Sequence, residues 1–332
     1  MHARTFVIAA LIAGCSAPAL AQGVSSQCPA GGSLSSDQRI QDACQKSIDL
    51  FAFMAPQLGT SLAGGNATLG QASTLAGLGH FSIGLRANVL KGALPQVNQI
   101  DVSTTGAVKS DFSTKDQILG LPTVDAAVGV YKGFPLGITH IGGVDALVSA
   151  TYLPNYETND IKIETGGSAL KFGYGARVGI LQESLLVPGL SVTWLKRDLP
   201  SVDITGNIGG ANDTIAVNDL QLKSTAWRVV ASKSFLIFGL AGGYGKDKYE
   251  SSADLLAVVD DGLLSTRKTI AFDQDLSRSN MFLDLSINVL MLKLVGEIGR
   301  VSGGSVPTYN TFGSHKADDA YTYGSVGFRV GF

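Results

Sequence analysis

Charge is scarce in this chain: among its 332 residues only 16% are Asp, Glu, Lys or Arg, and the formal net charge is −2. Soluble domains carry about a quarter charged residues. The sequence has no basic run or stripe, so it lacks the usual electrostatic basis for binding nucleic acid. It also has no long apolar run after its first two dozen residues, although a spanning helix needs about 20 apolar residues. Since 45% of the residues are nevertheless hydrophobic, β-structure is the favoured route into a membrane.

Patterns typical of catalytic and metal sites are absent as well. His80, His140 and His315 have no acidic or cysteine neighbour at ligand spacing, so we predict no metal ion and no cofactor. No G-x-S-x-G stretch surrounds a serine, and the glycine-rich segment 242–250 begins as an alternating strand with no helix after it. The sequence therefore predicts a protein that is not an enzyme.

Residues 1–21 have the layout of a secretory signal peptide. Arg4 gives the positive start, residues 6–13 are apolar, and the small residues Ala19 and Ala21 predict cleavage before Gln22. The alternative is cleavage before Cys15, because "IAGC" resembles the lipobox of bacterial lipoproteins. Either cut places the mature chain outside the cytoplasm.

Two cysteines remain after the signal is removed, Cys28 and Cys44. Disulfides form in exported proteins, and a bridge across so short a loop is worth about 3 kcal/mol in the chain-entropy model. We therefore predict a Cys28–Cys44 disulfide. The alternative is a pair of free, buried thiols.

Residues 22–75 are predicted to form a plug or cap segment. A helix is expected from Ser35 to about Phe53, because apolar residues recur at helical spacing after a serine cap, and Pro56 and Gly59 should stop it. A small, flexible, uncharged stretch follows. An apolar helix of this kind would be costly to expose, so we expect it in the lumen or across the mouth of a larger domain.

Residues 76–332 are predicted to form a transmembrane antiparallel β-barrel. From about His80 the hydrophobic pattern repeats every two residues, which is typical of strands with one apolar face. About eleven strands can be placed, and a further one is expected near Thr60–Thr74, giving about 12 in a range of 10–14. Tight joins alternate with long polar ones, expected at residues 155–166, 197–218, 248–266 and 302–319.

Ionisable residues on the other face of these strands should point into the lumen, since charges at membrane depth are tolerated only there. The candidate lumen-lining residues are Arg86, Asp125, Asp145, Lys171, Arg177, Arg228, Asp284, Lys293, Glu297 and Arg329. They would form either a polar pore wall or a salt-bridged interior that conducts nothing.

The last strand, "YTYGSVGFRVGF", ends in an aromatic residue after alternating apolar positions. It resembles the C-terminal signature of bacterial outer-membrane barrel proteins, with Tyr323, Phe328 and Phe332 as the assembly signal. The resemblance implies the bacterial outer membrane, its lipid and lipopolysaccharide as partners, and recognition by the barrel-assembly machinery. The N-terminal segment is similar in texture to the hatch of the outer-membrane fatty-acid transporter family, but it lacks the Asn-Pro-Ala motif of those hatches.

These features favour a barrel channel for passive uptake of a small-molecule cargo, with a hydrophobic molecule as one candidate. Two alternatives remain open. The first is a closed structural or adhesive barrel that acts through its outer loops. The second is a lipid-acting barrel enzyme, which would need a serine, a histidine and an acid together at the rim.

Overall fold

The computed structural model describes residues 23–332, apart from residues 158–161, 209–212, 261, 263–264 and 318. The signal-peptide prediction, with its two cleavage sites, therefore lies outside the described residues. The helices are α1 (Ser35–Ala63) and the short η1 (Val97–Gln99). None of the described helices is both long and apolar enough to cross a membrane. The strands are β1 (Phe81–Pro95), β2 (Thr114–Tyr131), β3 (Phe134–Leu136), β4 (Thr139–Ile141), β5 (Gly143–Tyr152), β6 (Tyr156–Glu157), β7 (Lys162–Thr165), β8 (Leu170–Leu181), β9 (Gly189–Asp198), β10 (Val202–Asn207), β11 (Thr214–Phe235), β12 (Phe238–Asp260), β13 (Ser265–Val289), β14 (Leu292–Val301) and β15 (Tyr321–Gly331).

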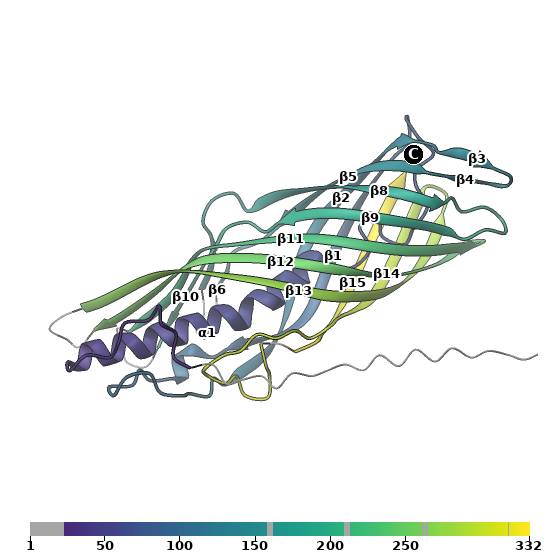
Figure 1. Ribbon diagram of the computed structural model, residues 1–332. Helices are drawn as coiled ribbons and strands as arrows, with labels where there is room; N and C mark the ends of the chain where they lie inside the picture. Colours follow the sequence, from purple (N-terminus) through teal and green to yellow (C-terminus); the bar gives the residue numbers. More distant parts are fainter. Residues whose placement is uncertain (1–22, 158–161, 209–212, 261, 263–264, 318) are drawn as a thin grey trace, which may run out of the picture.

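Ten of the described strands close into a ring (Figure 1). Their order is β12-β13-β14-β15-β1-β2-β5-β8-β9-β11, and β11 pairs with β12 to complete the circle. The first and last strands pair antiparallel, from Ser82 opposite Gly331 to Leu90 opposite Tyr323. The barrel prediction is confirmed, with ten strands at the lower limit of the expected range. The strand expected near Thr60–Thr74 is wrong, because that stretch ends α1 and then runs through the lumen without strand structure.

The wall of the ring is uneven in height. β5, β8 and β9 have 10, 12 and 10 residues, whereas β11, β12 and β13 have 22, 23 and 25. The long strands extend beyond the short ones at the end away from the short turns, which we call the upper end. There β10 pairs with β11, β7 with β10 and β6 with β7. The long polar join expected at residues 248–266 is wrong, since β12 continues to Asp260 and β13 begins at Ser265. The reason is that alternation persists there, with Leu255, Ala257 and Val259 buried in the hydrophobic core around α1.

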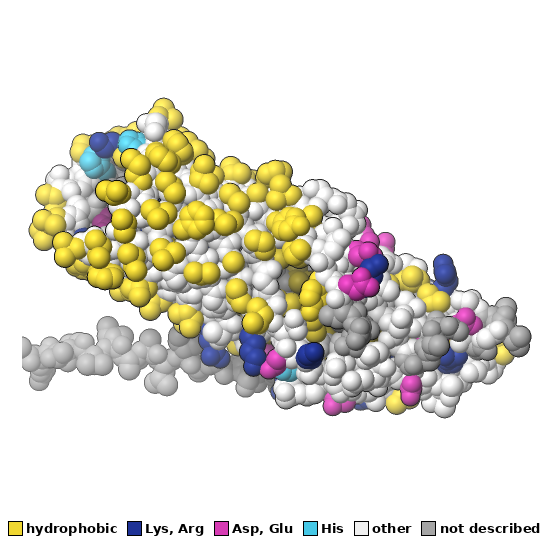
Figure 2. Space-filling model, turned by 180° about the vertical axis from the view of Figure 1, so that it is seen from behind, with side chains coloured by type: hydrophobic (Ala, Val, Ile, Leu, Met, Phe, Trp, Pro, Cys, Tyr) yellow, Lys and Arg dark blue, Asp and Glu magenta, His cyan; other side chains and the backbone are white. Residues whose placement is uncertain are grey.

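The outer face of the ring is apolar in the half nearer the short turns, which we call the lower half. Along β13, Met281, Leu283, Leu285 and Ile287 are exposed, while Phe282, Asp284 and Ser286 between them are buried. Figure 2 shows this apolar surface over most of one half of the molecule; charged side chains gather on the other half, and a few Lys, Arg and His side chains also lie at the far tip of the apolar half. We call this exposed surface the apolar belt. Tyr174, Trp194 and Trp227 meet on its upper side, with ring centroids 5.8 and 6.3 Å apart, as aromatic girdles do at a membrane interface.

Helix α1 lies inside the tall part of the wall and packs chiefly against β12 and β11 (Figure 1). It continues ten residues beyond the predicted end at Phe53, so the expectation that Pro56 and Gly59 stop it is wrong. Gly59 instead lets the helix approach β12: a Cβ there would lie 2.7 Å from the ring of Tyr249. The enclosing wall buries nearly every residue from Ile40 to Ala63, and tertiary packing of this extent offsets the cost of a proline inside the helix, about 3 kcal/mol.

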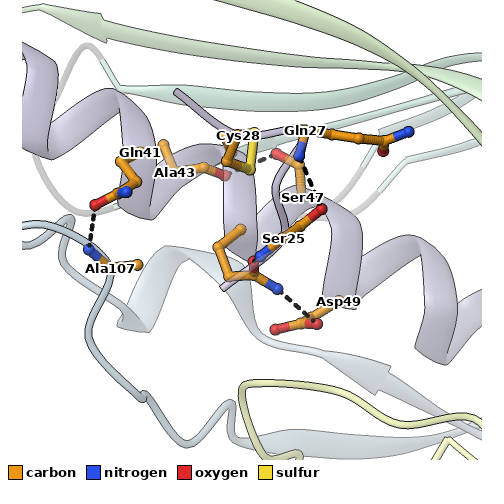
Figure 3. Close-up of a disulfide and its surroundings, with 10 residues drawn as sticks. Ser25, Gln27, Cys28, Gln41, Ala43, Ser47, Asp49 and Ala107 are labelled. Atoms are coloured by element: carbon orange, nitrogen blue, oxygen red, sulfur yellow. Dashed lines mark hydrogen bonds between the residues drawn. A yellow bond between two sulfur atoms is a disulfide. The ribbon is translucent and has the colours of Figure 1, made fainter. Parts of the chain in front are cut away.

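The predicted disulfide between Cys28 and Cys44 is present, with the two Cα atoms 5.7 Å apart. It fastens the segment before α1 to the side of the helix (Figure 3). Ser25 adds to this attachment, because its backbone N–H donates to Gln45 Oε1 at 2.7 Å.

Candidate functional site

The lower lumen is filled by the chain that follows α1. We call residues Gly64–Leu75 the plug segment. Nearly all of it is buried, and its backbone groups bond to charged side chains of the wall. A buried irregular backbone has to find such partners, since an unpaired N–H or C=O costs about as much as a lost hydrogen bond.

Two arginines bind the end of α1 and the start of the plug segment. Arg86 donates to the carbonyl oxygens of Gly64 and Asn66 at 3.1 and 3.0 Å. Arg228 donates to those of Gly65 and Ala63 at 3.3 and 3.4 Å. The last carbonyls of a helix have no intrahelical partner and carry partial negative charge. The two guanidinium groups therefore complete the helix and fix the point where the plug segment begins.

Two carboxylates from neighbouring strands accept bonds from the same segment. Glu297 accepts the N–H of Asn66 at 2.8 Å. Asp284 accepts the N–H of Gly70 and the side-chain amide of Asn66, both at 3.0 Å. Gly65 has φ +63°, and a Cβ at this glycine would overlap the Glu297 carboxylate. The turn that presents Asn66 to these acids thus requires glycine.

A second group holds the far end of the plug segment. Asp145 pairs with Arg177 at 2.6 Å and accepts the N–H of Leu75 at 3.0 Å. Arg177 also donates to Thr68. On the other side of the lumen, Lys293 donates to the carbonyl of Gly70 at 3.1 Å, and Arg329 donates to the side chain of Gln71.

Eight of the ten candidate lumen residues therefore contact the plug segment or the last residue of α1. They are Arg86, Asp145, Arg177, Arg228, Asp284, Lys293, Glu297 and Arg329. Asp125 is half-buried and binds Arg86 and Arg197 at 3.1 and 3.0 Å. Lys171 shares the inward-facing positions of β8 but is exposed, because its neighbour β5 ends one residue beyond the position opposite it.

Other contacts in the lumen were not predicted from the sequence. Asp247 is fully buried and pairs with Arg228 at 2.5 Å. Ser232 accepts the N–H of Ala72 at 3.0 Å, and Gln182 accepts the N–H of Thr74 at 3.1 Å. Asp247 could have been found by extending the two-residue alternation of β12 upward. Gln182 lies beyond a strand end, and nothing in its sequence context signals its role.

Two neighbouring apolar cavities lie above the plug segment, between α1 and the wall. One, of about 40 Å³, lies against Leu50, Phe51 and Met54 of the helix and Ile215 of β11. The other, of about 140 Å³, lies on the opposite side of Met54. Its lining includes Leu58, Leu94, Leu119, Leu121 and Leu153. Met54, Ile163 and Ile204 border both cavities, and Met54 is the flexible one of the three.

The larger cavity lies where the wall is incomplete. β2 pairs with β5 only from Thr123 onward; above Pro122, β1 is its only strand partner among the described residues. Proline has no N–H to give to a neighbouring strand, and Pro122 stands at this point. The free edge of β2 is linked to β6 by a 3.0 Å hydrogen bond from Gln117 Nε2 to Tyr156 Oη.

The polar face of α1 holds the loops above the cavities. Asp49 accepts bonds from the N–H groups of Tyr309 and Asn310 at 3.1 and 2.8 Å. Burial raises the pKa of Asp49 above its ordinary value, and the hydrogen bonds from Asn310 and Tyr309 offset part of this effect. Asp42 accepts the N–H groups of Ser103 and Val108 at 2.8 and 3.0 Å.

The described residues contain no group of three or more His, Cys, Asp or Glu side chains arranged to hold a metal ion. His315 lies 3.5 Å from Asp116 at the upper end of the wall. In the described part of the chain, no serine hydroxyl is hydrogen-bonded to a histidine side chain.

A closed antiparallel ring with an apolar belt, a polar interior, short turns at one end and long connections at the other defines a β-barrel of the bacterial outer membrane. No family model and no curated protein matches the chain. Among solved structures, it is similar to the TodX deltaS2S3 mutant monoaromatic hydrocarbon channel, at 9% identity and a TM-score of 0.34 over 82% of this chain and 97% of that one. It is also similar to the transport unit of the autotransporter AIDA-I from Escherichia coli, at 9% identity and a TM-score of 0.38 over 86% and 99%. The Pseudomonas putida toluene transporter TodX gives 11% and 0.33 over 82% and 98%. Similarities of this size do not transfer a function.

Proposed function

We propose that the protein takes up a small apolar molecule through the cavities on either side of Met54. The observation that carries this proposal is the pair of cavities themselves, whose lining is almost entirely aliphatic and aromatic. An apolar cavity of about 150 Å³ in a protein interior stays dry and binds benzene. The larger cavity here, at about 140 Å³, has the capacity for a molecule of that size.

The incomplete wall beside Pro122 supports entry of the apolar molecule into the larger cavity through the side of the barrel. Gln117 and Ile118 of β2 and Tyr156 of β6 belong to the lining of the larger cavity, and Ile118 is exposed. An apolar molecule could therefore reach the cavity from the surface by displacing one hydrogen-bonded pair, Gln117 and Tyr156.

Methionine provides the test, because only Met54, Met281 and Met291 remain after residues 1–21 are removed. We would label the methionine methyl groups with carbon-13 and titrate the detergent-solubilised protein with benzene. We expect a saturable shift of the Met54 methyl signal. Met281 and Met291 are exposed on the apolar belt and should shift in proportion to benzene dissolved in the micelle.

A variant pair makes this experiment decisive. Leu153→Trp should fill the larger cavity and remove saturation, whereas Val108→Trp, at an exposed loop position, should leave it. If the Met54 signal follows those of Met281 and Met291 without saturating, the cavities do not bind benzene and the proposal fails.

A second function, a closed structural or adhesive barrel, is supported by the occupied lumen. The same plug contacts that hold residues 64–75 would block ions as well as solutes. A bilayer that stays silent with the refolded protein, together with an unsaturable Met54 signal, would favour this second function over uptake. The enzyme alternative would require that the wild-type protein hydrolyses an ester and that the His315→Ala variant does not.

A further inference from the structure

The short-turn end of the barrel is bordered by exposed apolar side chains. Four connections join ring strands there, and each has an aliphatic residue at its tip. Leu236 and Leu290 are 100% and 101% exposed, and Leu185 is 91% exposed. We call the exposed apolar residues of the β11–β12 and β13–β14 connections the apolar rim; its members are Leu236, Ile237, Leu290 and Met291.

Two of these leucines adopt a backbone conformation that leucine avoids. Leu236 and Leu290 have φ +53°, each at the first central position of a two-residue hairpin turn. Hairpins normally place Gly, Asn or Asp at such positions, because those residues tolerate positive φ. In water, a fully exposed leucine side chain makes no apolar contact that would offset the strained backbone. Its presence at both equivalent turns therefore points to an apolar environment around the tips.

The dimensions of the apolar belt indicate which environment this is. At the upper side the belt ends at polar outward residues, Lys246, Ser279 and Arg300. At the lower side no polar residue stands between the belt and the tips of these turns on β11–β14, apart from Lys233, whose ammonium donates to the Ser184 carbonyl at 2.6 Å. From Met281 to Leu290 the chain advances nine residues, which is about 30 Å along a strand and roughly 21–25 Å along the membrane normal at the usual tilt.

The apolar band of an outer-membrane barrel is about 25 Å tall. The belt reaches this height only if the turn tips are counted in it. We propose that the apolar rim is inserted in the phospholipid leaflet on the periplasmic side, where the leucines contact acyl chains and anchor the barrel against vertical movement. The partner is thus a lipid surface, continuous with the lipid that surrounds the belt.

Fluorescence quenching tests this position directly. In a background where Trp194 and Trp227 are replaced by Phe, Leu236→Trp would be reconstituted in vesicles of phospholipids brominated at shallow or at deep acyl positions. We expect strong quenching by the shallow bromines, weaker quenching by the deep ones, and blue-shifted emission. Emission typical of water without quenching would overturn the proposal. Blue emission that depends on the protein-to-lipid ratio without quenching would assign the rim to a second copy and overturn it equally.

A substitution to asparagine gives a test whose sign differs between the two environments. Asparagine tolerates positive φ, so Leu236→Asn and Leu290→Asn should relieve strain and leave the urea midpoint unchanged or higher if the tips lie in water. If the tips lie in lipid, the lost apolar contact should lower the midpoint in vesicles. Val108→Asn, at an exposed loop position far from the belt, is the control and should change nothing. Should the Trp-free background fail to fold, Leu236→Cys labelled with bimane replaces it in the quenching experiment.

Discussion

Replacing Gly65 by alanine should loosen the plug segment while the barrel wall stays intact. Gly65 has φ +63°, where an L-residue other than glycine costs about 1–2 kcal/mol. The added Cβ would also overlap the Glu297 carboxylate. Glu297 must then move away from the Asn66 N–H that it accepts at 2.8 Å, and a buried donor left without its partner costs about 1–3 kcal/mol.

Together these effects disfavour the seated plug by about 3 kcal/mol, which corresponds to roughly a 100-fold change in an opening equilibrium. Amide hydrogen exchange measures this equilibrium, because protection reports the free energy of local opening even when the open state is rare. We expect amides of residues 66–75 to exchange about 100-fold faster in Gly65→Ala, and amides of the wall strands to keep their rates.

Two glycines serve as matched controls. Gly296 is the neighbour of Glu297 on the outer face, and a Cβ there meets nothing within 4 Å. Gly79 has φ +93° and also has open space around it, so Gly79→Ala tests backbone strain without a clash in the lumen. If Gly65→Ala exchanges no faster than these two variants while its heat-dependent gel mobility shows a folded barrel, the plug is not held by the Glu297 contact, and this explanation fails.

Two further predictions concern the chain around α1. Reducing the Cys28–Cys44 disulfide should release residues 23–34 to added protease without changing exchange at residues 66–75, since the bridge lies at the opposite end of the helix from the plug segment; faster exchange in the plug upon reduction would contradict this. The stability of the folded protein should fall as the pH rises through the titration of Asp49, because the charge that forms on this side chain is buried. Because burial raises the folded-state pKa of Asp49 above its ordinary value of 3.8, its contribution to stability is fully present below 3.8 and is lost as the pH rises through the raised value. The unfolding midpoint measured from pH 4 upward should therefore fall more steeply in the wild type than in Asp49→Asn, and equal slopes would refute the assignment.

The barrel was predictable from sequence because strand alternation is a local property. Each inward charge follows from its position in a strand and from the cost of charge in lipid, which is why Arg177 and Asp284 could be named without a structure. Lys171 obeys the same alternation and is nevertheless exposed. Its environment depends on the length of a neighbouring strand, which alternation within β8 does not encode.

The partners of the inward charges could not be predicted. A pore wall and a salt-bridged interior give the same alternating sequence, and only the path of residues 64–75 through the lumen decides between them. A signal for the incomplete wall is present, however: four Leu-Pro pairs, at 94–95, 121–122, 153–154 and 199–200. The leucines of the first three line the larger cavity, and Leu199 is buried in the adjoining hydrophobic cluster.

The position of the cavities constrains how passage through the lumen could be controlled. A ligand shifts an equilibrium only by the difference in its affinity for the two states. The linings of the two cavities beside Met54 include no residue of the plug segment, so an apolar molecule bound there makes no direct contact that changes when the plug moves. At the short-turn end, by contrast, a cavity of about 370 Å³ is lined by Gln71 and Ser73 of the plug segment and by Glu183, Lys233 and Lys293 of the wall. A polar or charged molecule arriving from the periplasm would contact plug and wall together. Under the proposed function, a signal that releases the plug would therefore act from the periplasmic side of the barrel, whereas the cargo would bind towards the outer side.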